Sequence, residues 1–211
     1  MQEGDGMMKI AVLASGRGSD FQSIIDGIER GEVNAKIEEM ITDNPSASAI
    51  EKAKKHSIDW KVVERKNYAS REEHDEEIMK ELDACKVELV VLAGYMGVIK
   101  NKNLLEKYRG KIINIHPSLL PKYPGAHAQR DAFEAGEKVS GFTIHFVDES
   151  LDGGAIIYQE KVDISECKSV DEAAAKILER EHIGLPKIVD SFAKGKYEIR
   201  GREVKYFPNQ K

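Results

Sequence analysis

The chain has 211 residues, of which 41% are hydrophobic and 33% charged, and a formal net charge of -5. This length suffices for one sizeable core, so we expect a single domain over residues 9–211 behind a disordered extension, residues 1–8, in which Met7 or Met8 is an alternative start. The acidic balance, with basic and acidic residues interleaved, argues against a general nucleic-acid binder, so any anionic ligand must be held locally.

The two cysteines indicate a reducing compartment. Cys85 and Cys167 lie far apart, without the spacing of a disulfide framework or a metal site. No apolar run approaches the ~18 residues that cross a bilayer, and no secretory signal leads the chain. We therefore expect a cytoplasmic protein that does not enter a membrane.

Apolar runs alternate with helical patterns in the first half of the chain. Strands are predicted at residues 9–14, 37–42, 60–63, 89–93 and 112–116, with helices at about 21–30, up to 55, and after the capping box 70–73. Five strands alternating with helices predict an α/β fold with a parallel, doubly wound sheet. In such sheets ligands bind beyond the carboxyl ends of the strands.

The turn after the first strand, Ser15-Gly16-Arg17-Gly18-Ser19-Asp20, resembles a phosphate-binding turn. The dinucleotide pattern fails because its third glycine would fall at Phe21, and the Lys-Ser/Thr of a Walker loop is missing. A strand, a glycine turn and a helix still present backbone N–H groups to one terminal phosphate. The alternative is a tight turn that only reverses the chain.

The pattern changes after Pro117. A helix is predicted over about residues 128–135, and strands over 142–147 and 156–162, which suit an antiparallel extension of the sheet after residue 140. A long helix begins near Ser169, and Pro186 is expected to bend or break it. Residues 197–207 predict a hairpin.

Three polar groups interrupt apolar strands in a way that favours a reaction site. Asn114 and His116 are two residues apart, so both project from the same face of their strand. His145 lies in the next strand, which leads to a loop carrying Asp152 before two glycines. An amide, an imidazole and a carboxylate at one edge suit acid/base chemistry. The alternatives are hydrogen-bonded core histidines and an Asp that only forms a turn.

These motifs together resemble a known family. Ser15-Gly16-Arg17-Gly18-Ser19, the segment Asn114-Ile115-His116-Pro117-Ser118-Leu119-Leu120-Pro121 with Tyr123-Pro124-Gly125, and Leu151-Asp152-Gly153-Gly154 are similar to motifs of the phosphoribosylglycinamide formyltransferases, the folate-dependent GAR transformylases. The likeness extends from Lys9 to about Phe192. It implies a Rossmann-like formyltransferase fold and formyl transfer from 10-formyltetrahydrofolate to the amine of 5-phosphoribosylglycinamide (GAR), a step of purine biosynthesis, in a monomer or homodimer.

The resemblance also implies roles for individual residues. Asn114 and His116 would stabilise an oxyanion, with Asp152 beside the histidine, and no metal is needed. His145 matches a family histidine that is structural rather than chemical. The implied GAR contacts are Gly18, Ser19, Asp20 and Glu181. The implied folate contacts are Arg71, Met96, Gly97, Val98, Ile99, Asn114, Asp148 and Asp152.

Two positions depart from the family pattern. Asn is common where this chain has Asp20, whose carboxylate would repel a phosphate that it faced, and bacterial relatives often carry Arg where it has Gly97.

Two other functions remain as alternatives to GAR formylation. A formyltetrahydrofolate hydrolase usually adds an N-terminal domain and methionyl-tRNA formyltransferase a C-terminal barrel, for which this chain has no room. The other alternative is a sugar-phosphate binder without catalysis, which three retained polar groups disfavour.

Overall fold

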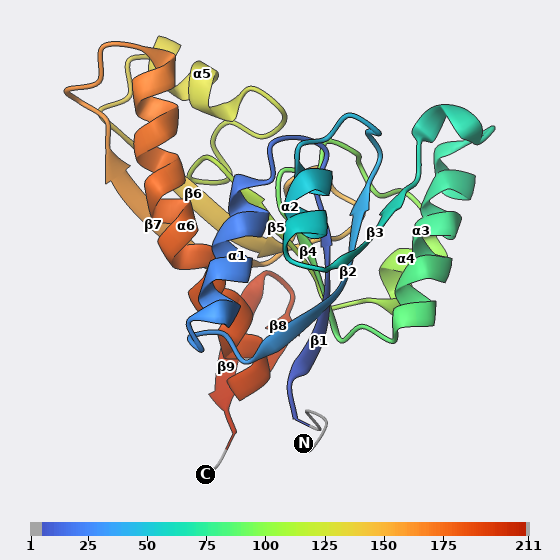
Figure 1. Ribbon diagram of the computed structural model, residues 1–211. Helices are drawn as coiled ribbons and strands as arrows, with labels where there is room; N and C mark the ends of the chain where they lie inside the picture. The colour runs from blue at the N-terminus through green and yellow to red at the C-terminus, as the bar shows by residue number, and fades with distance from the viewer. Residues whose placement is uncertain (1–5, 210–211) are drawn as a thin grey trace.

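One mixed sheet of seven strands runs through the computed structural model, which describes residues 6–209 (Figure 1). Its strands lie in the order β3-β2-β1-β4-β5-β6-β7. They are β1 (Met8–Leu13), β2 (Ala35–Thr42), β3 (Asp59–Val62), β4 (Leu89–Leu92), β5 (Ile112–His116), β6 (Val139–Phe146) and β7 (Ile156–Asp163). The first five are parallel, whereas β6 runs antiparallel to β5 and β7 antiparallel to β6. The predicted doubly wound sheet with an antiparallel extension is confirmed.

Several strand boundaries differ by one to three residues from the sequence prediction. Residues 1–5 of the predicted extension lie outside the described residues, and β1 already begins at Met8, which pairs with Ala35 of β2. β6 begins at Val139 and so includes Gly141, whereas the predicted strand begins at Phe142. A Cβ on Gly141 would lie 1.9 Å from the carbonyl oxygen of Glu160 on β7, so only glycine permits this approach.

The central strands are buried on both faces because helices cover both. Along β1, Ile10 and Val12 join one hydrophobic cluster, whereas Ala11 and Leu13 join the other. The first cluster also contains apolar residues of α1, α2 and α6, and the second those of α3 and α4. The helices are α1 (Ser19–Glu29), α2 (Ala49–Lys55), α3 (Arg71–Cys85), α4 (Lys102–Lys107), α5 (Ala128–Glu134) and α6 (Val170–Lys194), with a 3-10 turn η1 (Arg65–Asn67). Helix α4 was not predicted.

Helix starts follow the capping residues. Ser70 accepts a hydrogen bond from the backbone N–H of Glu73 through its side chain, at 3.1 Å, and this begins α3 as the capping box predicts. Asn101 caps α4 and Ser169 caps α6 in the same way. These contacts satisfy backbone donors that the first turn of a helix leaves unpaired.

Pro186 does not break the last helix. Helix α6 is continuous from Val170 to Lys194, so of the two expected effects of Pro186 the break is wrong and the bend stays a prediction. Pro186 is buried, and a Cβ built on Gly27 of α1 would lie 3.3 Å from its Cβ. A proline removes one helical hydrogen bond, but here the turns on both sides are packed against α1 and the sheet, which holds the helix together.

The predicted hairpin is present as β8 (Gly195–Arg200) and β9 (Glu203–Pro208), a separate two-stranded sheet. Tyr197 attaches it to the body of the protein, because the centroid of its ring lies 4.5 Å from that of Phe192 on α6. Within the hairpin, the ring centroid of Tyr197 lies 4.9 Å from that of Tyr206. Such aromatic pairs each add stability beyond the area that they bury. Within residues 6–209, no helix combines the length and apolar character of a membrane span.

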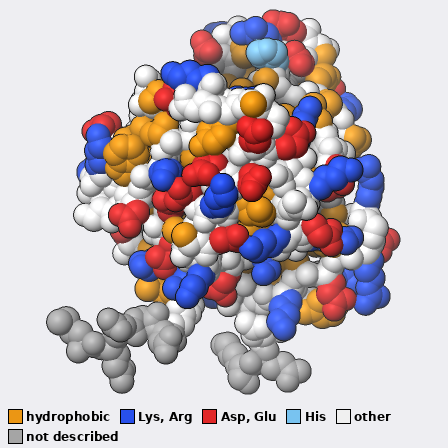
Figure 2. All heavy atoms as spheres, turned by 90° about the vertical axis from the view of Figure 1, so that its right-hand side faces the viewer, with side chains coloured by type: hydrophobic (Ala, Val, Ile, Leu, Met, Phe, Trp, Pro, Cys, Tyr) orange, Lys and Arg blue, Asp and Glu red, His pale blue; other side chains and the backbone are white. Residues whose placement is uncertain are grey.

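The surface carries charges of both signs. Figure 2 shows one face, on which Lys and Arg side chains lie interspersed with Asp and Glu, with small apolar patches between them. On this face, described residues form no broad basic area of the kind that follows a nucleic-acid backbone.

Candidate active site

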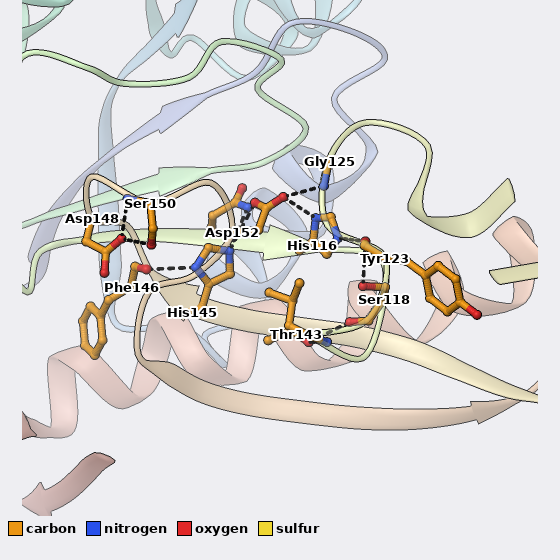
Figure 3. Close-up of polar contacts among 12 residues, drawn as sticks. His116, Ser118, Tyr123, Gly125, Thr143, His145, Phe146, Asp148, Ser150 and Asp152 are labelled. Carbon is orange, nitrogen blue, oxygen red and sulfur yellow. Dashed lines mark hydrogen bonds and ion pairs between the residues drawn. The ribbon is translucent and has the colours of Figure 1, made fainter. Parts of the chain in front are cut away.

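The end of β5 brings two polar side chains to one edge of the sheet. Asn114 is partly buried and His116 is 4% exposed. Nε2 of His116 donates to the backbone carbonyl of Tyr123, at 2.8 Å (Figure 3). A carbonyl only accepts, so this contact places a proton on Nε2 and leaves Nδ1 as the second functional nitrogen.

His145 is brought to the site by strand register, since it pairs directly opposite Asn114. Its Nδ1 donates to the carbonyl of Phe146 at 2.8 Å, and its Nε2 accepts from Nδ2 of Asn114 at 3.1 Å. Burial lowers the pKa of His145, which favours this neutral form. The neutral imidazole therefore fixes the direction of the Asn114 amide.

Asp152 joins the two histidines from the loop between β6 and β7 (Figure 3). Its Oδ2 lies 3.5 Å from Nδ1 of His116 and accepts the backbone N–H of Gly125 at 2.8 Å, while Oδ1 lies 3.7 Å from Nε2 of His145. Asp152 has a left-handed backbone, with φ of 50°. A Cβ on Gly154 would lie 1.8 Å from the carbonyl oxygen of Phe146, so this glycine permits a close approach that closes the loop.

These groups stand in the wall of a cavity of about 410 Å³. This volume is within the range of small-molecule sites, roughly 300–1,000 Å³. The wall is completed by the loop after β4 (residues 94–99), residues 125–126 and residues 147, 148 and 150–152. Met96, Val98 and Leu151 expose 65%, 41% and 58% of their surface, so the cavity has an apolar border that suits a planar, partly apolar ligand.

The loop after β4 is held by polar contacts from two other elements. Its Met96 N–H donates to the side chain of Ser15 at 2.9 Å. The buried carboxylate of Asp75 on α3 accepts the N–H groups of Lys100 and Asn101, at 2.6 and 3.1 Å. The first contact also joins this loop to the glycine turn after β1.

Gly97 is explained by its neighbour Tyr95. A Cβ on Gly97 would lie 2.6 Å from Cε1 of Tyr95, so the tyrosine ring fills the space that a side chain at this position needs. Tyr95 is 8% exposed and lines the cavity. The departure from the family pattern at position 97 is therefore coupled to the placement of this ring.

The glycine turn leads into the N-terminus of α1. Gly18 is the N-cap, with φ of 67°, and a Cβ there would lie 2.8 Å from Cβ of Ala49. Within residues 6–209, no side chain caps this helix, so its first N–H groups remain available for an anion. Ser19 lines a neighbouring hollow of about 330 Å³ with Lys52 and His182.

Asp20 and Glu181 form a buried pair of carboxyl groups beside this turn, with exposed fractions of 8% and 4%. Burial raises the pKa of Asp20 to about 6, although Arg17 lowers it. Burial also raises the pKa of Glu181 well above its usual value, and nearby Asp20 raises it further. Oδ1 of Asp20 lies 3.7 Å from Nε2 of His182, so the carboxylate is directed towards α6.

The implied folate contacts are only partly gathered in one place. Met96, Gly97, Val98, Ile99, Asn114, Asp148 and Asp152 all line the cavity. Arg71, at the start of α3, lies outside its wall, and its Nη1 is buried without a hydrogen-bond partner among the described residues. Asp148 accepts the N–H of Ser150 at 2.8 Å, which shapes the cavity edge.

Three residues at these sites were missed by sequence reasoning. Tyr123 acts through its backbone carbonyl, and no side-chain pattern signals such a contact. Lys52 on α2 packs beside the glycine turn, where a Cβ on Gly18 would lie 3.5 Å from its Cδ. His182 follows Glu181 directly, but only the packing of α6 on α1 brings it to Asp20. Among residues 6–209, no cluster of three His, Cys, Asp or Glu side chains is arranged to hold a metal ion.

Comparison with known proteins agrees with the geometry. The family model described as formyl transferase matches residues 8–189. The chain belongs to the formyl transferase family. Among its relatives, the phosphoribosylglycinamide formyltransferase of Haemophilus influenzae is 41% identical, over 92% of this chain and 91% of the relative. That of Escherichia coli is 36% identical, over 91% and 90% of the two chains.

Solved structures extend this formyl transferase likeness to the fold. Glycinamide ribonucleotide transformylase 1 from Symbiobacterium toebii superimposes with a TM-score of 0.92 at 38% identity, covering 96% of this chain and 95% of that one. A formyltetrahydrofolate deformylase from Pseudomonas syringae is 23% identical with a TM-score of 0.88, which shows a shared fold alone. The predicted family membership is confirmed.

Proposed function

We propose that this protein transfers the formyl group of 10-formyltetrahydrofolate to the amine of GAR, giving formyl-GAR and tetrahydrofolate in de novo purine biosynthesis. The observation that carries this proposal is the convergence of Asn114, His116 and Asp152 on the wall of one cavity. Relatives with the name phosphoribosylglycinamide formyltransferase match this chain over most of both lengths. Both substrates are small molecules.

The first chemical step forms an oxyanion. The GAR amine attacks the formyl carbon, a C–N bond forms, and the carbonyl electron pair moves to oxygen. Nδ2 of Asn114 donates one hydrogen to His145, and its other hydrogen can bind this oxygen. His116 donates from Nδ1, because its Nε2 is already bound to Tyr123. Donors held in position before the reaction stabilise the developing charge without reorganisation.

The second step moves a proton and breaks a bond. The attacking nitrogen must lose a proton and N10 of the folate must gain one before the old C–N bond breaks. Asp152 is placed to favour a protonated His116 and to orient a water molecule for this transfer. Its anchor on Gly125 keeps the carboxylate in place during both steps.

The folate occupies the 410 Å³ cavity in this proposal. Residues 96–99 contact the pterin through the backbone, with Asp148, Asp152 and Asn114 on the opposite side. Arg71 stays a predicted contact for a part of the folate beyond the cavity wall. These assignments rest on the lining of the cavity and on the family resemblance.

The GAR phosphate occupies the turn at the start of α1. Gly18, Ser19 and Asp20 contribute backbone N–H groups, and Glu181 lies on the ribose side. We add Lys52, whose stem packs beside Gly18, as a nearby positive charge. The contact between Ser15 and Met96 joins this turn to the cavity, which supports one continuous site for both substrates.

A formyl-transfer assay tests the function. The purified protein is mixed with GAR and 10-formyltetrahydrofolate, and loss of the formylated folate is followed together with formyl-GAR. We expect both changes in equal amounts, and no loss of folate when GAR is omitted. Folate loss without GAR would indicate a hydrolase, and binding without turnover would indicate a non-catalytic protein.

A further inference from the structure

The buried pair Asp20 and Glu181 lies beside the proposed phosphate site and is not explained by binding alone. Asp20 is the second residue of α1, so its backbone belongs to the turn that faces the phosphate, while its carboxylate is packed towards α6. Within the described chain, its Oδ1 lacks a hydrogen-bond partner. Two buried carboxylates that lie close together are not both ionised at little cost, because each lacks the water that stabilises its charge.

The charged groups near the pair only partly offset the cost of ionising both buried carboxyl groups. From the turn, the exposed Arg17 acts on Asp20, and from α2 the stem of Lys52 passes beside Gly18. From α6, His182 approaches Asp20, but burial lowers the pKa of His182, which favours its neutral form. Asp26 on α1 acts on His182 and adds a negative charge to this side. A bound phosphate adds further negative charge.

We propose that binding of the phosphorylated substrate is coupled to the uptake of a proton by the Asp20–Glu181 pair. This inference rests on the proposed function, because it places the substrate phosphate at the turn of Gly18 and Ser19. The proton comes from solvent and remains on a carboxyl oxygen of the pair while the phosphate is bound. A neutral carboxylic acid also supplies an O–H donor that an ionised carboxylate lacks.

Protonation removes the repulsion between the Asp20 carboxylate and a bound phosphate. An ionised Asp20 would repel a phosphate at the same helix N-terminus, whereas a protonated one does not. By linkage, a ligand whose binding makes the protein take up a proton binds more weakly as pH rises, by up to about tenfold per pH unit for one proton. The second pKa of a phosphate monoester is about 6, so above about pH 7 the ligand itself contributes little.

The test uses ribose 5-phosphate, which has the phosphate and sugar but lacks the reactive amine. Its binding to the full-length protein is followed calorimetrically between about pH 7 and pH 8.5, in two buffers of different ionisation enthalpy, which gives the number of protons exchanged. We expect the wild type to take up ~0.5–1 proton and its Kd to rise roughly six- to thirtyfold over this range. We expect the near-isosteric Asp20→Asn to take up less than ~0.2 proton and to show less than about a twofold change in Kd.

Two further variants complete the test. Glu181→Gln should also reduce proton uptake, because each of the two substitutions replaces one carboxyl group of the pair by an amide that does not titrate. Glu179→Gln, exposed on the same helix as Glu181 and outside the pair, should take up the same number of protons as the wild type. A cooperative thermal unfolding transition is the check that each variant is folded. Asp20→Asn removes a buried charge with little change in side-chain volume.

Several outcomes would overturn the coupling. They are no proton uptake by the wild type, unchanged uptake in Asp20→Asn, or no binding of ribose 5-phosphate at millimolar concentration. Wild-type formyl transfer, measured in parallel, separates this inference from the proposed function. Transfer without proton uptake removes only the coupling, whereas proton uptake without transfer removes only the proposed reaction.

Discussion

The Oδ2 atom of Asp152 lies 3.5 Å from Nδ1 of His116, although the two residues are 36 positions apart in the chain. The same oxygen accepts the N–H of Gly125, so the carboxylate is held between the loop after β5 and the loop after β6. His116 is held in turn by the carbonyl of Tyr123. The pair is therefore positioned before any substrate arrives, which is the condition for efficient proton transfer.

Replacing the carboxylate of Asp152 tests this pair. We expect Asp152→Asn to lower kcat by roughly 10²–10³, because an amide does not stabilise a protonated His116 or accept a proton from water. The Kd of the sugar phosphate should stay within about twofold, since Asp152 contacts the folate side. Steady-state kinetics with both substrates and ribose 5-phosphate binding make the measurement. Asp59→Asn, on the exposed β3, is the matched control.

Removing an oxyanion donor should have a similar effect on turnover. Asn114→Ala or His116→Ala should each reduce kcat by roughly 10²–10³, while binding of each ligand persists, because the donors act mainly on the charge that develops in the reaction. Single-turnover rates and equilibrium binding separate the two effects. Asn103→Ala, at an exposed position of α4, should have wild-type kinetics. Near-normal turnover of both site variants would contradict the assignment.

Gly97 and Tyr95 should be energetically coupled. Gly97→Ala places a Cβ 2.6 Å from the ring of Tyr95, so the ring must move towards the cavity or the loop must shift. Overpacking of this kind destabilises proteins by about 1–3 kcal/mol, and we also expect the KM for the folate to rise several-fold. Urea unfolding and kinetics measure the two effects. Adding Tyr95→Leu should recover part of the lost stability, and equal losses in the single and double variants would refute the coupling.

Glu39 makes stability depend on pH. It is 8% exposed on β2 and accepts a weak hydrogen bond from Sγ of Cys85 at 3.9 Å. Burial, followed by the charge of Glu81, raises the pKa of Glu39 to about 7 from 4.5. A pKa that is higher in the folded state means that the protonated form favours folding. The contribution is complete below about pH 4.5 and is lost as pH rises through about 7.

The variant Glu39→Gln should therefore be more stable than the wild type at alkaline pH. We expect an increase of about 1–2 kcal/mol in the free energy of unfolding near pH 8.5, after allowance for nearby Lys61, and a much smaller difference near pH 5.5. Urea unfolding at both pH values makes the comparison. Glu76→Gln, exposed on α3, should show no such pH dependence. An equal effect of Glu39→Gln at both pH values would refute the explanation.

Local sequence patterns were sufficient for most of the fold. Each parallel strand has either a continuous apolar run, which indicates burial on both faces, or alternating apolar and polar residues, which indicate burial on one face. Ser70 marks the start of α3, because its side chain accepts from the backbone N–H of Glu73, three residues later. One helix was missed, because the short α4 has a weak local signal. The start of β6 was placed three residues late, because the close packing of Gly141 against β7 is a tertiary contact.

The sequence by itself determined that Asn114 and His116 share one face of β5, because strand periodicity acts over two residues. The tertiary structure decided the rest of the site. Strand register places His145 opposite Asn114, loop closure brings Asp152 to His116, and packing of α6 on α1 buries Asp20 with Glu181 and carries the helix past Pro186. These contacts join residues tens of positions apart, and their energies depend on burial and distance, which exist only once the chain has folded.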